Sequence, residues 1–191
     1  MNVALTKPWT VEQFLSWAAH QEARYEFDGQ RPVAMTGGSA NHSRITLNIH
    51  GALRTRLRGT PCSSFGPDLG VRTIGDAIRY PDALITCTRF AGTEKIAPDV
   101  VVVFEVLSLG SGRRDRIEKV REYAAVASIR HYVIVESSSS GLLVLHRQQG
   151  DAAFTALTLT SEDILTLPEI GVQVPVAEFY EDVDFDTAPT E

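Results

Sequence analysis

The sequence predicts an α/β fold in which helices flank a mixed central sheet. Residues 100–107 are Val-Val-Val-Val-Phe-Glu-Val-Leu, an apolar, β-branched run typical of a strand buried on both faces. A helical stretch at 113–127 and a second apolar run at 131–136 follow it. This order indicates a right-handed crossover between two parallel strands, and a strand predicted at 79–87 precedes them.

The first 35 residues predict a helix followed by a hairpin. Thr10-Val-Glu-Gln13 matches a capping box, and apolar residues follow it at helical spacing, so a helix is expected from Thr10 to about His20. Residues 25–27 and 31–35 flank Asp28-Gly29, a pair that favours a tight hairpin turn.

A long helix is expected over residues 41–58, because apolar residues recur there at four-residue intervals. They are Ile45, Ile49, Leu53 and Leu57. The remaining strands are expected at 63–65, 70–74 and 142–147, with a β-rich end through Val174. No internal repeat or linker is evident, so residues 1–180 are predicted to form one domain, followed by an acidic tail at 181–191.

Composition argues against several classes of protein. No apolar stretch approaches the roughly 20 residues that span a bilayer, and residues 1–10 show no signal-peptide pattern. We therefore expect a cytoplasmic protein that does not enter the membrane. Cys62 and Cys87 have no CxxC spacing, which predicts free thiols in a reducing cytosol and no zinc site.

Charge is unevenly distributed along the chain. The formal net charge is −6, and the segment 178–191 contains six acids and no Lys or Arg. Residues 1–177 therefore carry 18 acids and 18 bases, so the body can present a basic face beside an acidic pocket. The chain does not have the clearly basic character of a constitutive, high-affinity DNA binder.

Glu105 is the most informative residue, because it lies within a strand predicted to be buried. An unpaired carboxylate there would cost several kcal/mol, so a cation, a donor or a metal must satisfy it. Asp82 follows Pro81 at the start of another apolar run, and Lys119 lies on the next helix. Two acids and one lysine form a plausible site for a divalent metal and an activated water.

This set fits the hydrolysis of a phosphodiester. Mg²⁺, with Mn²⁺ as a substitute, prefers oxygen ligands, which Asp82, Glu105 and the carbonyl of Val106 would supply. Lys119 would orient the water or stabilise developing negative charge. Simpler interpretations remain open: Lys119 as part of a solvated, ion-paired helix face, and Asp82 as a strand-start residue after a proline turn.

The same residues carry a resemblance to a known family. The motifs are Arg79-Tyr-Pro-Asp-Ala-Leu-Ile85, Phe104-Glu-Val-Leu-Ser108, Asp115-Arg-Ile-Glu-Lys-Val-Arg-Glu-Tyr123, Tyr25-Glu-Phe-Asp-Gly29 and His131-Tyr-Val-Ile-Val-Glu136. In this order, over roughly residues 10–180, they resemble the Uma family of proposed restriction endonucleases in the PD-(D/E)xK superfamily. The resemblance implies a restriction-endonuclease-like core and a Mg²⁺-dependent site that cleaves DNA.

Carried over by position, the resemblance assigns Asp82 and Glu105 as the metal acids and Glu26 as an additional acid. Without the resemblance, Glu26 is equally well an exposed residue of the hairpin. The chain departs from the superfamily at Leu107, where a lysine is usual. The family is thought to use a lysine from the following helix, which here is Lys119. The loop 108–112 also differs from the family's usual Ser-Pro-Ser-Thr.

Contacts with DNA are predicted for a further set of residues: His42, Arg54, Arg58, Arg113 and Arg114. His42 matches a histidine of the family, and the arginines can bind phosphates. Ordinary polar residues at helix ends explain them equally well or better.

The sequence thus predicts a metal-dependent endonuclease that hydrolyses DNA. The alternative is a catalytically inactive nucleic-acid-binding or interaction module on the same fold, which Leu107 and the acidic net charge favour. A homodimer is expected, because two sites would suit the two strands of DNA.

Overall fold

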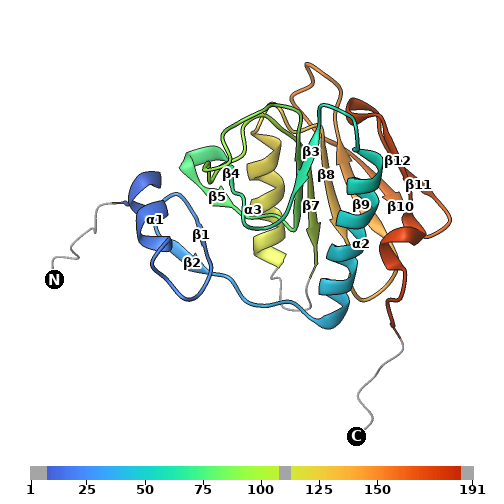
Figure 1. Ribbon diagram of the computed structural model, residues 1–191, viewed down its shortest axis with the longest axis horizontal. Coiled ribbons are helices and arrows are strands. Elements are labelled where there is room, and N and C mark those ends of the chain that lie inside the picture. The colour runs from blue at the N-terminus through green and yellow to red at the C-terminus, as the bar shows by residue number, and fades with distance from the viewer. Residues whose placement is uncertain (1–7, 108–112, 186–191) are drawn as a thin grey trace, which may run out of the picture.

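The computed structural model describes residues 8–107 and 113–185, and for residues 113–116 the backbone only. A six-stranded sheet forms the centre, with strand order β10-β9-β8-β7-β6-β3 (Figure 1). Its strands are β3 (Ser63–Phe65), β6 (Ala83–Thr86), β7 (Val100–Val106), β8 (His131–Val135), β9 (Leu142–His146) and β10 (Thr155–Leu159). β7 and β8 are parallel and the other neighbours are antiparallel, so the predicted mixed sheet is confirmed.

Helices cover both faces of this sheet (Figure 1). α3 (Arg113–Ala124) is the crossover between β7 and β8, and it packs on one face through Tyr123. α2 (Ala40–Arg56) packs on the other face through the predicted apolar stripe, including Ile45 and Ile49. The ribbon β11 (Ile164–Leu167) and β12 (Val172–Pro175) joins the α2 side with the short helices η2 (Pro168–Ile170) and η3 (Val176–Tyr180). Two covered faces explain why β7 is apolar along nearly its whole length.

The N-terminal helix and hairpin are also confirmed. α1 (Val11–Ala18) begins at the Thr10 cap, and both hydrogen bonds of the capping box to Gln13 are present. The hairpin strands β1 (Tyr25–Phe27) and β2 (Pro32–Ala34) belong to a second sheet of order β2-β1-β5-β4. Its other strands are β4 (Val71–Arg72) and β5 (Ile78–Arg79), separated by the short helix η1 (Ile74–Asp76).

The strand predicted over 79–87 is wrong as a single element. Arg79 ends β5 in the smaller sheet, whereas Ala83 begins β6 in the central sheet. Pro81 lies between them and has no N–H to donate to a strand ladder, so the chain leaves one sheet and enters the other. This break places Arg79 and Asp82 at the junction of the two sheets.

The prediction of free thiols is wrong as well, because Cys62 and Cys87 form a disulfide. β3 and β6 are antiparallel with Ser63 opposite Thr86, so the next positions outward, Cys62 and Cys87, face each other. The sequence argument for a reducing compartment loses this support. None of the described helices is long and apolar enough to cross a membrane.

Candidate active site

Glu105 lies near the end of β7, on the face covered by α3. Tyr123 donates a hydrogen bond from its hydroxyl to Glu105 Oε1 at 2.9 Å. Lys119 Nζ lies 3.2 Å from the same oxygen and 3.4 Å from Oε2. Lys119 and Tyr123 are one helical turn apart, so α3 presents both to one carboxylate.

A second set of ion pairs joins this centre to the hairpin. Lys119 Nζ is 3.4 Å from Glu26 Oε1, and Arg79 donates from Nη1 to Glu26 Oε2 at 2.9 Å. Arg79 also binds both oxygens of Glu122, at 2.6 and 2.7 Å. The Arg79 side chain is only 5% exposed. It therefore ties β5 to β1, which carries Glu26, and to α3, which carries Lys119 and Glu122.

Asp82 lies just before β6, opposite Glu105 in the strand register and next to α2. Its Oδ2 accepts a hydrogen bond from the backbone N–H of Val106 at 2.7 Å and lies 3.3 Å from His42 Nε2. His50 Nε2 lies 2.9 Å from the Asp82 carbonyl. Two side chains of α2 thus hold Asp82 beside the peptide that follows Glu105.

The strand register explains why the two acids meet. β6 and β7 are antiparallel with Ala83 opposite Phe104, so the next position places Asp82 opposite Glu105. Residues opposite each other in an antiparallel pair project to the same face. Both strands are neighbours in the central sheet, so their pairing alone brings the two acids together.

Electrostatics at this centre oppose ionisation of Glu105. Burial raises the pKa of Glu105 to about 7; the Lys119 ammonium lowers it, whereas the Asp82 and Glu26 carboxylates raise it further. The pKa of His42 is also raised, first by its hydrogen bond to Asp82. The pKa of the Arg79 guanidinium is raised because Glu122 and Glu26 outweigh the opposing effect of burial.

The charges of this centre are compatible with a hard divalent cation. Four acids (Glu26, Asp82, Glu105 and Glu122) surround two permanent cations, Arg79 and Lys119. A divalent cation would balance the excess and favour ionised Glu105. Within the described part of the chain, no three His, Cys, Asp or Glu side chains converge on a common metal position. Mg²⁺ keeps several waters and needs only one or two carboxylates, so Asp82 and Glu105 fit it better than they would fit zinc.

The predicted site residues therefore divide into three groups. Glu26, Asp82, Glu105, Lys119 and His42 are brought together. Arg54 and Arg58 are exposed on and just after α2. The side chains of Arg113 and Arg114, and the loop 108–112, lie outside the described residues. Glu26 is only 7% exposed and not the exposed hairpin residue of the simpler interpretation.

Three residues of the site were not predicted from the sequence. They are Tyr123, which binds Glu105, and Arg79 and Glu122, which bind each other. Tyr123 could have been found, because it lies four residues after Lys119 and so shares its helix face. The bidentate pair between Arg79 and Glu122 joins residues 43 positions apart, and no local signal indicates it.

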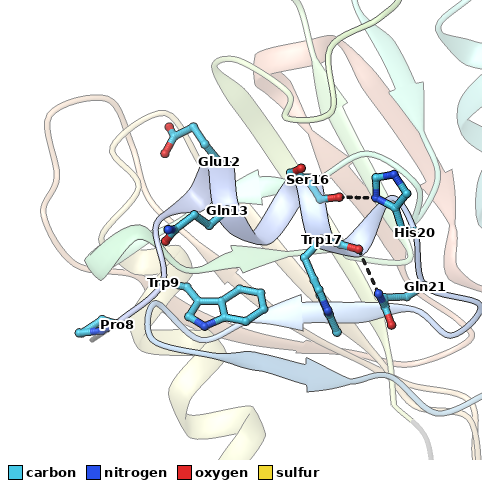
Figure 2. A pocket seen from close by; sticks show the side chains of 8 residues that line it. All are labelled: Pro8, Trp9, Glu12, Gln13, Ser16, Trp17, His20 and Gln21. Carbon is cyan, nitrogen blue, oxygen red and sulfur yellow. Dashed lines mark hydrogen bonds between the residues drawn. The ribbon is translucent and has the colours of Figure 1, made fainter. Parts of the chain in front are cut away.

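One groove of the described structure lies away from these acids. It has a volume of about 800 Å³ and runs along α1, where Trp9 and Trp17 line it (Figure 2). A neighbouring groove of about 630 Å³ shares Trp9 with it and is bordered by Arg79 and Glu122. This second groove therefore reaches the Arg79–Glu122 pair between the hairpin loop, through Asp28 and Arg31, and α3.

Comparison with known proteins defines the class of this fold. A crystal structure from Anabaena variabilis, described as a "putative nuclease belonging to DUF820", superposes with a TM-score of 0.69 and 15% identity, over 91% of this chain and 98% of that one. The two proteins share a restriction-endonuclease-like α/β fold.

The family is defined by sequence. Residues 11–177 match the Uma2 family model, described as "Putative restriction endonuclease", and the chain belongs to this family. Two proteins of Synechocystis sp., both described as uncharacterised, are similar to it. One, slr1290, is 30% identical over 91% of this chain and 92% of its own length. The other, sll1609, is 24% identical over 71% and 79%.

Proposed function

We propose that the protein is a Mg²⁺-dependent endonuclease that hydrolyses phosphodiester bonds of DNA. The observation that supports this most directly is the convergence of Asp82, Glu105 and Lys119 at the end of two central strands. Membership of a family described as restriction endonucleases supports the same reaction class.

Each residue has a distinct role in this proposal. Asp82 and Glu105, with the carbonyl of Val106, would hold Mg²⁺, which when bound supplies an acidified water and stabilises charge on the phosphate oxygens. Lys119 would donate from Nζ to the attacking water or to the negative charge that develops on the phosphate. Tyr123 holds Glu105 in place through its 2.9 Å hydrogen bond.

The helix lysine can act where Leu107 cannot. Leu107 is 9% exposed and packs in the apolar cluster on the α3 face. Lys119 reaches Glu105 from α3, and its second contact with Glu26 fixes the direction of its ammonium. Glu26 is assigned here to the positioning of Lys119, because its oxygens are already bound by Lys119 and Arg79.

Plasmid nicking tests this function. Wild-type protein should nick supercoiled DNA in Mg²⁺ or Mn²⁺ and stop when a chelator is added, whereas Asp82→Asn and Glu105→Gln should be inactive. Glu162→Gln, which changes an exposed acid before β11, is the matched control and should retain activity. Full activity in both site variants would remove the assignment.

An inactive nucleic-acid-binding or interaction module is the second candidate. It is favoured by Lys119 and Arg79, which already neutralise part of the acid cluster without any metal. This candidate predicts salt-sensitive DNA binding without cleavage in any divalent cation. Cleavage that a chelator abolishes would exclude it.

We also propose that the protein acts as a homodimer, because two copies would present one site to each DNA strand. Sedimentation equilibrium at micromolar concentration tests this directly. A mass of one chain at all concentrations, with and without DNA, would contradict it.

A further inference from the structure

One face of α2 is basic and points away from the sheet. Arg44 and Arg54 are exposed on this helix, and Arg58 is exposed in the turn that follows it. Their spacing of ten and four residues places them along one side of the helix, together with Gly51 and with Leu47, which is 63% exposed. We name this set (Arg44, Leu47, Gly51, Arg54 and Arg58) the α2 outer face.

The arginines of the α2 outer face have no acidic partner among the described residues. No ion pair or side-chain hydrogen bond joins Arg44, Arg54 or Arg58 to another part of the described chain. Arg56 of the same helix differs, because it forms a bidentate pair with Glu178. α2 itself contains no acidic residue. Within the described residues, three arginines without an ion-pair partner thus lie on α2 and in the turn after it, in a chain whose formal net charge is −6.

The described part of the acidic C-terminal segment, residues 181–185, lies beside this face. Asn48 donates to the carbonyl of Glu181, and Asn41 donates to the carbonyl of Asp184. These asparagines lie on the side of α2 between the outer face and the core. Residues 181–185 therefore border the α2 outer face along one side.

The structure assigns the α2 outer face as the docking surface for the sugar–phosphate backbone of duplex nucleic acid, an assignment that rests on the proposed nuclease function. Arginine binds phosphate through charge and paired N–H groups. Arg44 and Arg54 are about 15 Å apart along the helix axis, about the length of four base pairs. The face contains no aromatic side chain, which a single-strand surface would use to stack bases.

The same helix leads to the candidate site. His42 lies in the first turn of α2, two residues before Arg44, and contacts Asp82 at 3.3 Å. The first turn of α2, where the outer face begins, is therefore the end of the helix that contacts Asp82. In this proposal, phosphate contacts along α2 position the duplex without readout of base sequence.

Binding of a fluorescent 20-base-pair duplex in the presence of chelator tests the assignment without requiring cleavage. The triple variant Arg44→Gln, Arg54→Gln, Arg58→Gln keeps helix propensity and removes three charges. It should lower the slope of log affinity against log salt by about 2 to 3, since each phosphate contact contributes roughly 0.9. At fixed moderate salt, binding should weaken by more than tenfold.

The control removes the same charge elsewhere. Arg24, Arg31 and Arg72 are exposed and paired with Asp68, Asp28 and Asp76, and their triple Gln variant should bind like wild type. Equal loss in both triple variants would show a net-charge effect and overturn the assignment. So would an unchanged slope in the α2 variant, or a loss confined to single-stranded DNA or to anionic vesicles. The Asp82→Asn protein should bind the duplex like wild type but should not nick it. Binding therefore tests the docking surface and nicking tests the proposed catalytic site, so either proposal can fail without the other.

Discussion

Replacing Glu105 by Gln distinguishes two roles of this carboxylate: a ligand for a metal cation, or the partner of Lys119 in a structural ion pair. Burial raises the pKa of Glu105 from its ordinary value of 4.5 to about 7. At about 1.4 kcal/mol for each tenfold change in acidity, ionising Glu105 in the folded protein costs roughly 3 kcal/mol at alkaline pH. Gln has nearly the same shape and removes this cost.

The pH dependence follows from the sign of the shift. Between about pH 4.5 and 7 the folded protein holds a proton on Glu105 that the unfolded chain has released, so wild-type stability falls as pH rises through this window. Glu105→Gln should therefore be nearly neutral at pH 5 and more stable than wild type by about 2 to 3 kcal/mol at pH 8.5. Mg²⁺ should stabilise wild type at pH 8.5 and leave the variant unchanged.

Urea unfolding followed by circular dichroism, at both pH values and with and without Mg²⁺, measures these differences. Glu162→Gln serves as the control for loss of an exposed acid. A Glu105→Gln variant that is 3–5 kcal/mol less stable than wild type at pH 8.5 would refute the reasoning, because Glu105 would then be holding Lys119 as an obligatory pair.

Three further changes test the surrounding network by denaturant unfolding. Tyr123→Phe removes a buried hydrogen bond to Glu105. It should lower the free energy of unfolding by about 1.5–3 kcal/mol at pH 8.5 and by less at pH 5. An equal loss at the two pH values would contradict a hydrogen bond to an ionised carboxylate. Arg79→Met removes the bidentate partner of the partly buried Glu122 and one of the two cations at the buried Glu26, and should cost about 3–5 kcal/mol. Arg72→Met, at an exposed pair, should cost less than about 1 kcal/mol. Similar values for the two variants would be inconsistent with a structural role for the Arg79 ion pairs. Cys62→Ser should cost about 3 kcal/mol and make stability insensitive to reductant, and two titratable thiols in unreduced, unfolded wild type would disprove the disulfide.

Much of the fold could be predicted because its signals are local. The capping box at Thr10 and the Asp28-Gly29 turn depend on neighbouring residues, and both elements form as predicted. The apolar run 100–107 predicted a strand covered on both faces. The order of strand, helix and strand predicted the parallel pair of β7 and β8.

The errors concern contacts between distant segments. Residues 79–87 have the composition of one strand, and only the pairing of β5 with β1 and of β6 with β7 shows that they belong to two sheets. The Cys62–Cys87 disulfide depends on the register of β3 and β6, which spacing in the sequence does not reveal.

The candidate site was predictable in its acids and its lysine, since a buried Glu105 requires a partner. The ion pairs that hold these residues in place could not be predicted. Arg79 is an ordinary strand residue in sequence, and its position between Glu26 and Glu122 depends on how the hairpin packs against α3.

Metal binding tests the central claim most directly. Titration of Mn²⁺ into the protein, followed by electron paramagnetic resonance of the free ion, should show saturable binding in wild type and loss of that binding in both Asp82→Asn and Glu105→Gln. Equally tight Mn²⁺ binding by wild type and both variants would contradict the claim that these two carboxylates share a divalent ion.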